Sequence, residues 1–454
     1  MSTTTLNNIS DCRRELVISI SQDEFSKFYK ESLTNLQKKV KMPGFRPGKV
    51  PANVIQSQYG NSIKMEAAEN AANNYLKEYV ESSNIHLVGH PSLVDISTSE
   101  DKTTHTYKIE FEVIPDFELG DYKSIVVDEP VHRVTDEEID KEIQAIAKSM
   151  GTRENLEQVT DYDTQVIIDS YRIDPETKEI QSGVEPEKNI PIDLSQVNLE
   201  DLKNLLINSK VGDELVYEPN KEKNANLIPE KIVIKEIFRM VPVAIDDEFA
   251  KKASQGKFDN IDDFRQEVGF GMQKFWDDKT RRELEIQIAD KLIEMHESFS
   301  IPQALLSVAK EQIESNLKKQ NTDLNNEHVK KYIDSQSDKL VRLELVRDRI
   351  IEKEQIEVED YDIDSFADKY FNGIGQNSDS ISRETLSSYI KGDERTMQAL
   401  LQNKLMDLLL DFATTNEVSF EDYNKRINDE VAAEIASEKD QKHQEDCTCD
   451  DCGC

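Results

Sequence analysis

The stretch of sequence that decides the fold is MPGFRPGKVP, residues 42–51. It lies between two helix-forming stretches and contains two glycines and three prolines. Proline fixes the backbone dihedral φ and glycine permits tight turns, so the sequence predicts a stiff loop with Phe45 and Arg46 at its tip. A phenylalanine ring can fill a pocket on a partner while the neighbouring guanidinium binds phosphate or carboxylate.

The same region carries the basic patch of an otherwise acidic chain. The formal net charge is -35, from 91 acidic and 56 basic residues. At that acidic fraction, residues 32–65 would contain about seven acidic side chains, but they contain none. A protein of this charge repels nucleic acid and anionic lipid, so any contact with nucleic acid must be local. The basic residues of the patch are Lys38, Lys39, Lys41, Arg46, Lys49 and Lys64.

Phe45 has two interpretations at this point. The loop can be a simple connection between helices, with the Phe45 ring folded back onto the core, because most phenylalanines are buried. Alternatively, the ring is exposed and binds a partner. The composition of the loop does not decide between them.

The composition predicts a cytoplasmic protein of several domains. At 454 residues the chain is long enough for roughly three domains. No basic stretch followed by an apolar run opens the sequence, and no run approaches the roughly 18 apolar residues of a membrane-spanning helix. Four of the five cysteines lie in the last eight residues, so no disulfide framework is indicated.

Hydrophobic periodicity predicts an α+β domain over residues 1–115. Alternating apolar residues predict strands at residues 13–20, near Leu93 and at residues 104–113. Ser21 and Glu24 form a capping box, which starts a helix that ends before residue 43.

Two further helices are predicted in this domain. Pro51 suits the first turn of a short helix, and Gly60 is its expected C-terminal cap. A longer, alanine-rich helix is expected from Ile63 to about Glu81.

The remaining sequence divides into a linker with one helix (116–151), a β-rich domain (152–241), a helical domain (242–440) and a disordered cysteine-rich tail (441–454). Thr135 and Glu138 form a second capping box at the start of the first helix. This helix and the later helical domain each need a packing partner. The simplest packing joins them, which makes the helical domain discontinuous and the β-rich domain an insertion. The predicted fold class is therefore α+β and multidomain.

One long helix after residue 327 has apolar residues at heptad spacing. Gln336 and Arg347 interrupt this stripe. The predicted core positions are Val329, Ile333, Leu340, Leu343 and Ile350.

The loop closely resembles the ribosome-binding signature of the trigger factor family. The family pattern is a Gly-Phe-Arg loop followed by a glycine and a nearby proline, and Pro47 stands where many members carry lysine. The resemblance continues through YKIEFEVIPDFELGDYKSI and IDDEFAKKAS, and it spans about residues 13–430. The residues that match the signature are Gly44, Phe45, Arg46, Gly48 and Pro51, with Lys49 at a common basic position.

The resemblance implies three parts and a function. It implies an N-terminal α+β ribosome-binding domain, an inserted FKBP-like prolyl isomerase domain, and an all-α C-terminal domain whose arms form a cradle. The implied function is that of a ribosome-associated, ATP-independent chaperone for nascent and unfolded polypeptides. The implied partners are the ribosome near the nascent-chain exit, through ribosomal protein and rRNA, and the nascent chains themselves, with no membrane. Whether the free protein forms a homodimer is not decided by the sequence.

Isomerase activity is the alternative function. An FKBP-like isomerase holds the prolyl amide in an apolar aromatic pocket, away from water. The family's Pro-Gly-Phe-Glu stretch has no counterpart in SQVNLEDLKNLLINSKVGDEL, so the sequence predicts a retained fold with an eroded pocket and leaves the catalytic residues unknown. The aromatic residues of this segment are Tyr162, Tyr171, Tyr217 and Phe238, and their positions in strand-like runs favour core packing.

The helical domain contains apolar residues that either line a client cradle or pack in the core, and core packing accounts for most of them. No His-Glu-x-x-His spacing and no glycine-rich phosphate loop occur. The residues in question are Met397, Leu400, Leu401, Leu405, Leu408, Leu409 and Phe412.

The C-terminal sequence CTCDDCGC carries the one candidate metal site. Four thiolates in a C-x-C-x-x-C-x-C array suit a soft ion such as zinc or copper(I), although cysteines clustered by chance in a disordered tail are the alternative. No other cofactor is expected. The candidate ligands are Cys447, Cys449, Cys452 and Cys454, with His443 as a further candidate.

Overall fold

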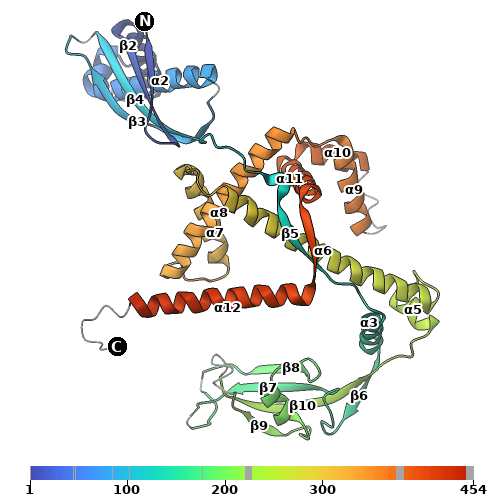
Figure 1. The fold of residues 1–454 in the computed structure, drawn as a ribbon. Coiled ribbons are helices and arrows are strands. Elements are labelled where there is room, and N and C mark those ends of the chain that lie inside the picture. The colour runs from blue at the N-terminus through green and yellow to red at the C-terminus, as the bar shows by residue number, and fades with distance from the viewer. Residues whose placement is uncertain are drawn as a thin grey trace. The chain divides into compact units, whose positions relative to one another are not determined.

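The computed structural model describes residues 2–43, 45–46, 48–83, 85–101, 103–175, 177–181, 183–219, 228–374 and 383–445. They form two compact units, each assembled from two stretches of sequence (Figure 1). The first unit comprises Met1–Glu129 and Arg282–Glu417, and the second comprises Pro130–Arg281 and Val418–Cys454.

The first unit begins with an antiparallel four-stranded sheet in the order β1-β2-β4-β3. The strands are β1 (Thr3–Asn8), β2 (Arg13–Ser21), β3 (Leu87–Thr98) and β4 (Thr104–Val113). Every second residue of β4 is buried, which is the pattern of a strand with one face against a core. The strands predicted at 13–20, near Leu93 and at 104–113 are therefore confirmed.

Helices α1 (Gln22–Lys39) and α2 (Ala52–Ser83) pack on the buried face of this sheet. The capping box predicted at Ser21 and Glu24 starts α1. Small residues of α2, among them Ala67 and Ala71, allow the helix to lie close to the strands. Asn70 of α2 donates a 3.2 Å hydrogen bond to the buried Ser32 hydroxyl of α1, which ties the two helices together.

The predicted break at Gly60 is wrong, because α2 continues through it without interruption. Ile55 and Ile63 are both fully buried in one cluster, so the same helix face stays apolar on both sides of the glycine. A glycine within a helix costs only about 1 kcal/mol relative to alanine, and this burial outweighs it.

The helical part of the first unit is held by a core that joins distant segments. The 3-10 turn η1 (Tyr122–Ser124) and strand β5 (Val126–Val131) follow the sheet, and β5 pairs with β11 (Thr414–Ser419). Tyr122, Ile125 and Val127 are buried among residues of α6 (Ile261–Met295), α8 (Glu327–Glu354) and α11 (Glu394–Phe412). The other helices are α7 (Gln303–Lys319), α9 (Asp360–Ile374) and α10 (Arg383–Gly392).

The heptad prediction for α8 is wrong in part. Ile333 and Ile350 are buried as expected, but Leu340 is exposed. The buried face instead follows a four-residue step, which is not the alternation of three and four residues that a coiled-coil seam requires. Its buried positions are Ile333, Ser337, Val341, Arg342, Leu345, Val346 and Ile350.

The second unit contains the β-rich segment. Its sheet has the order β6-β10-β7-β8, and β9 also pairs with β10. The strands are β6 (Thr152–Leu156), β7 (Gln165–Arg172), β8 (Glu187–Asp193), β9 (Glu214–Tyr217) and β10 (Glu230–Val241). The helix α4 (Glu200–Leu206) contributes the buried Leu202 and Leu206 to the core of this sheet.

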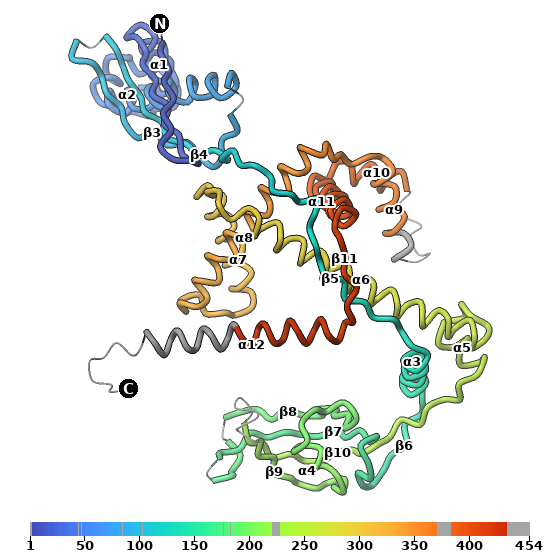
Figure 2. Tube along the Cα trace, viewed as in Figure 1, coloured from blue at the N-terminus to red at the C-terminus, as the bar shows by residue number. Residues whose placement is uncertain are grey.

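The chain enters and leaves this sheet through neighbouring strands, β6 and β10 (Figure 2). Thr152, the first residue of β6, pairs with Val241, the last residue of β10. A Cβ atom on Gly151 would lie 2.2 Å from the Val241 carbonyl oxygen, so only glycine permits this approach of the two connections.

Helix α3 (Asp136–Ser149) packs against α5 (Asp247–Ala253) and the first part of α6. Ile143 of α3, Phe249 of α5 and Phe264 of α6 share one buried cluster. The predicted packing of the helix near residue 140 on the helices after residue 244 is confirmed, as is its capping box at Thr135. The last helix of the unit is α12 (Phe420–Glu445).

In the β-rich segment the sequence predicts strands at residues 165–173, 214–217 and 231–238, which β7, β9 and β10 confirm, but four strands were not predicted: β1, β6, β8 and β11. Apart from single intermediate residues, β1, β6 and β11 are exposed, and β8 has no buried residue. β1, β6 and β11 lack the apolar alternation on which the prediction depends, whereas in β8 it is limited to Ile190 and Ile192, which pack against the core of the sheet. β6 and β11 are fixed by pairing with the distant strands β10 and β5, whereas β1 and β8 pair with the strands that are next to them in sequence, β2 and β7.

We predict that Tyr107→Phe stabilises the first unit. The Tyr107 side chain is fully buried, its hydroxyl has no hydrogen-bond partner among the described residues, and burial raises its pKa. Removing an unpaired buried hydroxyl should raise the free energy of unfolding by about 1 kcal/mol. Urea unfolding measures the change. Tyr122→Phe is the matched control and should lower stability, because the Tyr122 hydroxyl donates a 2.5 Å hydrogen bond to Glu354; equal effects of the two substitutions would contradict the prediction.

Candidate functional site

The loop of residues 40–51 connects α1 to α2 and is anchored on both sides of its tip. Val50 is fully buried in a cluster with Ile55 and Ile63, and Val40 and Met42 pack against the same cluster. The Gln37 side-chain amide donates a 2.7 Å hydrogen bond to the Val50 carbonyl. The two ends of the loop are thus held by apolar burial and by this hydrogen bond.

The tip itself points away from the core. Phe45 is 42% exposed, and the Arg46 and Lys49 side chains are also exposed. The Phe45 N–H donates to the Met42 carbonyl, and the Lys49 N–H donates to the Arg46 carbonyl, so two tight turns flank the exposed pair. Gly48 has φ +75, which favours glycine at this position. Of the two interpretations of Phe45, the folded-back ring is wrong.

The predicted site residues fall into two groups. Phe45, Arg46, Gly48 and Lys49 lie together in the described loop, whereas Gly44 lies outside the described residues. The six basic side chains of the patch are all exposed, and none forms an ion pair with another described residue. Their charge is therefore available to an anionic partner, which is the electrostatic requirement for a local contact with RNA.

In the β-rich sheet, the aromatic side chains have packing roles. Tyr217 is buried, and its hydroxyl lies 3.3 Å from an Asp201 carboxylate oxygen; burial, and secondly the charge of Asp201, raises the pKa of Tyr217 to about 12. Phe238 is buried beneath Arg153, whose guanidinium lies 3.8 Å from the ring centroid. Tyr162 is exposed, and its hydroxyl donates to Asn204. The expected core packing is confirmed for Tyr217 and Phe238 and is wrong for Tyr162, which lies outside the strands.

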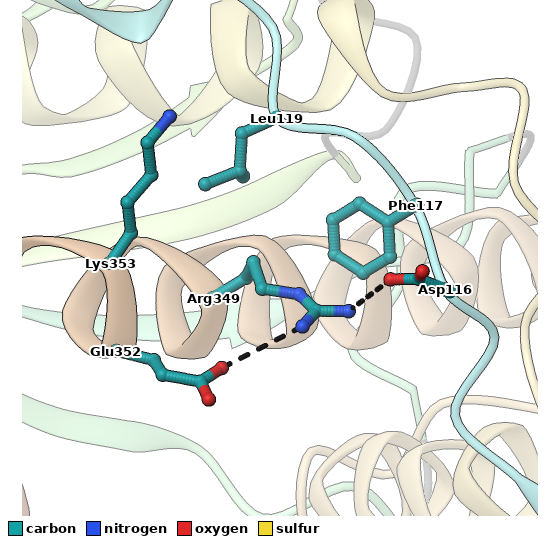
Figure 3. Close-up of a pocket in the computed structure, with 6 residues that line it drawn as sticks. All are labelled: Asp116, Phe117, Leu119, Arg349, Glu352 and Lys353. Carbon is teal, nitrogen blue, oxygen red and sulfur yellow. Dashed lines mark hydrogen bonds and ion pairs between the residues drawn. The ribbon is translucent and has the colours of Figure 1, made fainter.

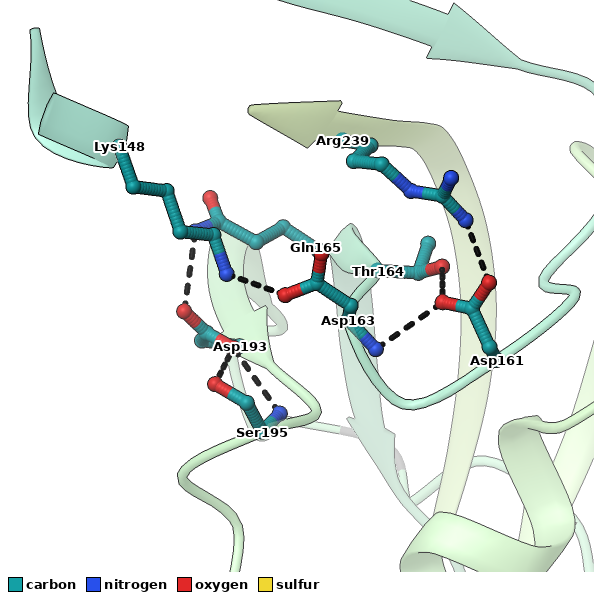
Figure 4. Close-up of polar contacts among 8 residues, drawn as sticks. All are labelled: Lys148, Asp161, Asp163, Thr164, Gln165, Asp193, Ser195 and Arg239. Atoms are coloured by element: carbon teal, nitrogen blue, oxygen red, sulfur yellow. Dashed lines mark hydrogen bonds and ion pairs between the residues drawn. The ribbon is translucent and has the colours of Figure 1, made fainter. Parts of the chain in front are cut away.

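A network of charged residues joins α3 to this sheet (Figure 4). Lys148, in the last turn of α3, donates a 2.5 Å hydrogen bond to Asp163. Burial raises the pKa of Asp193, but hydrogen bonds from Ser195 and the charge of Lys148 outweigh burial and hold that pKa below its usual value. Because these groups are hydrogen-bonded or ion-paired with one another, the network holds the sheet against α3. It offers no free catalytic group.

Of the seven candidate cradle residues, three are buried, and Met397 and Phe412 are partly buried against core clusters. Leu400, Leu405 and Leu409 are buried in core clusters. The large apolar side chains that remain exposed lie on other helices, such as Val308 on α7 and Tyr332 on α8. Sequence reasoning missed them, because an isolated apolar residue on a long amphipathic helix gives no signal of its exposure.

A small cavity of about 330 Å³ lies where the segment after β4 passes over α8 (Figure 3). Arg349 points across it to Asp116 at 2.8 Å, and its guanidinium lies 5.4 Å from the Phe117 ring centroid. Phe117 in turn stacks on Phe299 at 4.2 Å. The residues that line the cavity therefore already contact one another. These contacts hold the segment that follows the sheet against the helices.

Within the part of the chain that the structure describes, no group of three or more His, Cys, Asp or Glu side chains is arranged to hold a metal ion. The predicted cysteine ligands at positions 447, 449, 452 and 454 lie outside the described residues, as does the side chain of His443. No described helix is long and apolar enough to cross a membrane.

Comparison with known families identifies the chain. A model of the bacterial trigger factor protein matches residues 1–146, and a model of the bacterial trigger factor C-terminus matches residues 260–411. Together they span well over half of the sequence. The chain belongs to the trigger factor family.

Individual trigger factors align with this chain along nearly their whole length. The trigger factor of Chlorobaculum parvum is 25% identical over 414 residues, which cover 89% of this chain and 95% of the relative. That of Clostridium acetobutylicum is 27% identical over 423 residues, with 88% and 96% covered. A solved structure from work on promiscuous substrate recognition by the trigger factor chaperone covers 90% of this chain and 99% of its own, at 18% identity and a TM-score of 0.49.

Proposed function

We propose that the protein is a ribosome-associated, ATP-independent chaperone that binds nascent and unfolded polypeptides and keeps them competent for folding or export. The observation that carries this proposal is the exposed pair Phe45 and Arg46, on an anchored loop with the family's signature, within the basic patch of an acidic chain. Membership of the trigger factor family supports the same function.

We assign the parts of this function as follows. Residues 1–115 dock on the ribosome near the nascent-chain exit, where the loop contacts ribosomal protein and rRNA. Residues 242–440, together with the helix of 116–151, form the chaperone body, and residues 152–241 form an FKBP-like insertion. A protein that works at the ribosomal exit acts in the cytoplasm.

The alternative function is prolyl isomerisation by the β-rich insertion. It requires an aromatic pocket that isolates an X-Pro bond from water. The packing of Tyr217 in the core and of Phe238 beneath Arg153 argues against this alternative.

We predict that the double substitution Phe45→Ala with Arg46→Ala weakens ribosome binding by at least about ten-fold, because an anchor ring and a charged contact are lost together. The protein should stay folded, since both side chains are exposed. Cosedimentation with ribosomes at two salt concentrations measures the effect, and binding of the unsubstituted protein should weaken as salt rises.

The matched control for this experiment is the substitution of a basic residue outside the patch, Lys178→Ala, which should leave ribosome binding unchanged. Undiminished binding of the double variant would remove the basis for assigning the loop to the ribosome.

We predict that the β-rich insertion accelerates an X-Pro-limited refolding reaction far less than an isomerase with an aromatic pocket does. Uncatalysed isomerisation takes about 10 to 100 s at 25 °C, so refolding assays resolve it readily. Strong acceleration by the full chain that is lost on substitution of Tyr217 and Phe238 would establish the alternative function.

The cysteine-rich tail is proposed to bind one zinc ion per chain through its four thiolates. Reduced full-length protein should take up zinc, and a chain truncated after Glu445 should not. The truncation should leave the rest of the fold unaffected. Equal zinc uptake by both proteins would refute the site.

A further inference from the structure

Strand β3 forms a free edge of the N-terminal sheet. No other described strand pairs with its outer side. One end of β3 is covered, because a Cβ atom on Gly89 would lie 2.6 Å from the Cβ of Ala304 in α7. The other end, residues 94–98, is exposed throughout. An exposed strand edge presents unpaired backbone N–H and C=O groups to any extended chain.

A groove of about 670 Å³ lies beside this free edge, between β3 and α2. Strand register places Ile96 of β3 opposite Tyr107 of β4, so both side chains face the helices. Met65 of α2 is 56% exposed, Ile96 is 38% exposed, and both line the groove together with Phe25. Large apolar side chains are thus exposed on two sides of the groove.

The polar groups of the groove favour an uncharged occupant. Both ring nitrogens of His105 are engaged, with the Thr98 hydroxyl at 3.1 Å and the Gln22 amide oxygen at 2.6 Å. Lys64 and Glu100 contribute one charge of each sign to the lining, so their charges cancel. The groove therefore differs from the neighbouring basic patch, which suits anions.

The backbone of β3 favours an extended occupant. The Ser99 N–H donates to the Thr104 carbonyl of β4 at 2.9 Å. Donors alternate in direction along a strand, so the N–H groups of Ile96 and Thr98 point to the free edge. A chain that pairs there would extend the sheet, and every second side chain of it would lie on the face of Ile96, over the groove.

We propose that residues 95–98 of β3 and the adjoining groove bind an extended, uncharged apolar segment of an unfolded polypeptide as an added strand. This inference rests on the proposed chaperone function and gives it a specific subsite in the N-terminal sheet. The subsite selects alternating apolar residues, because only every second side chain reaches the groove. It is distinct from the exposed apolar residues of the helices, which impose no strand geometry.

The test uses the full chain and a short, uncharged peptide in which valine or leucine alternates with serine or threonine. One central residue of the peptide is a photoreactive phenylalanine analogue, and crosslinked positions are mapped by mass spectrometry. Crosslinks are expected on β3 and α2. A second peptide, N-methylated at alternate amides, has the same side chains but cannot pair with a strand edge, and these crosslinks should disappear.

Substitutions in the chain provide the matched comparison. Ile96→Asp and Met65→Asp should each reduce crosslinking to the groove about ten-fold or more, because a buried apolar contact is replaced by a charge. Val94→Asp is the control on the same strand. Val94 is the extra residue of the bulge between Leu93 and Asp95 and does not line the groove, so this variant should crosslink like the unsubstituted protein.

Suppression of aggregation of a denatured protein by the same full chain separates failure of the subsite from failure of the chaperone function. If aggregation is suppressed but peptide crosslinks fall only on the helices, the β3 subsite is refuted and the chaperone function stands. If neither suppression nor any crosslink is found, both proposals are refuted. Equal crosslinking of the two peptides would also refute strand pairing.

Discussion

The burial of residues 122–127 among later helices is the constraint on which the rest of the structure depends. Tyr122, Ile125 and Val127 have their side chains in a core formed with residues of α6, α8 and α11. The chain must therefore leave this core after β5 and return to it with the second part of α6. The residues between β5 and the second part of α6 lie outside this core. The helical body is therefore discontinuous in sequence.

How much could be predicted depended on whether the deciding interaction was local. The capping boxes at Ser21 and Thr135 and the anchored loop follow from neighbouring residues, and the structure has each of them. The continuity of α2 through Gly60 depends on burial of Ile55 and Ile63 against α1, which local glycine chemistry does not reveal. The groove beside β3 had no signal at all, since Met65 and Ile96 meet only through the tertiary fold.

Two chemically different surfaces meet on α2. Lys64 belongs to the exposed basic patch and also lines the groove, where Glu100 contributes the opposite charge, and the next residue, Met65, adds an apolar side chain to the groove. Side chains that are adjacent in a helix point about 100° apart, so Lys64 can lie at the border of the two surfaces while Met65 belongs to the groove alone. On a chain with a net charge of -35, the basic patch gives a local attraction for an anionic partner, and the groove gives none.

The close approach of Gly151 to Val241 has a consequence for how the body of the protein can form. The ends of an inserted segment that lie this near each other act like a closed loop with almost no span, whose entropy cost grows only slowly with its length. The sheet lies between α3 and α5 in sequence. Helix α3 can therefore pack on α5 and α6 either before or after the sheet folds. A domain held at such a neck can be lengthened, shortened or replaced during evolution, while the helices on either side keep the same neighbours.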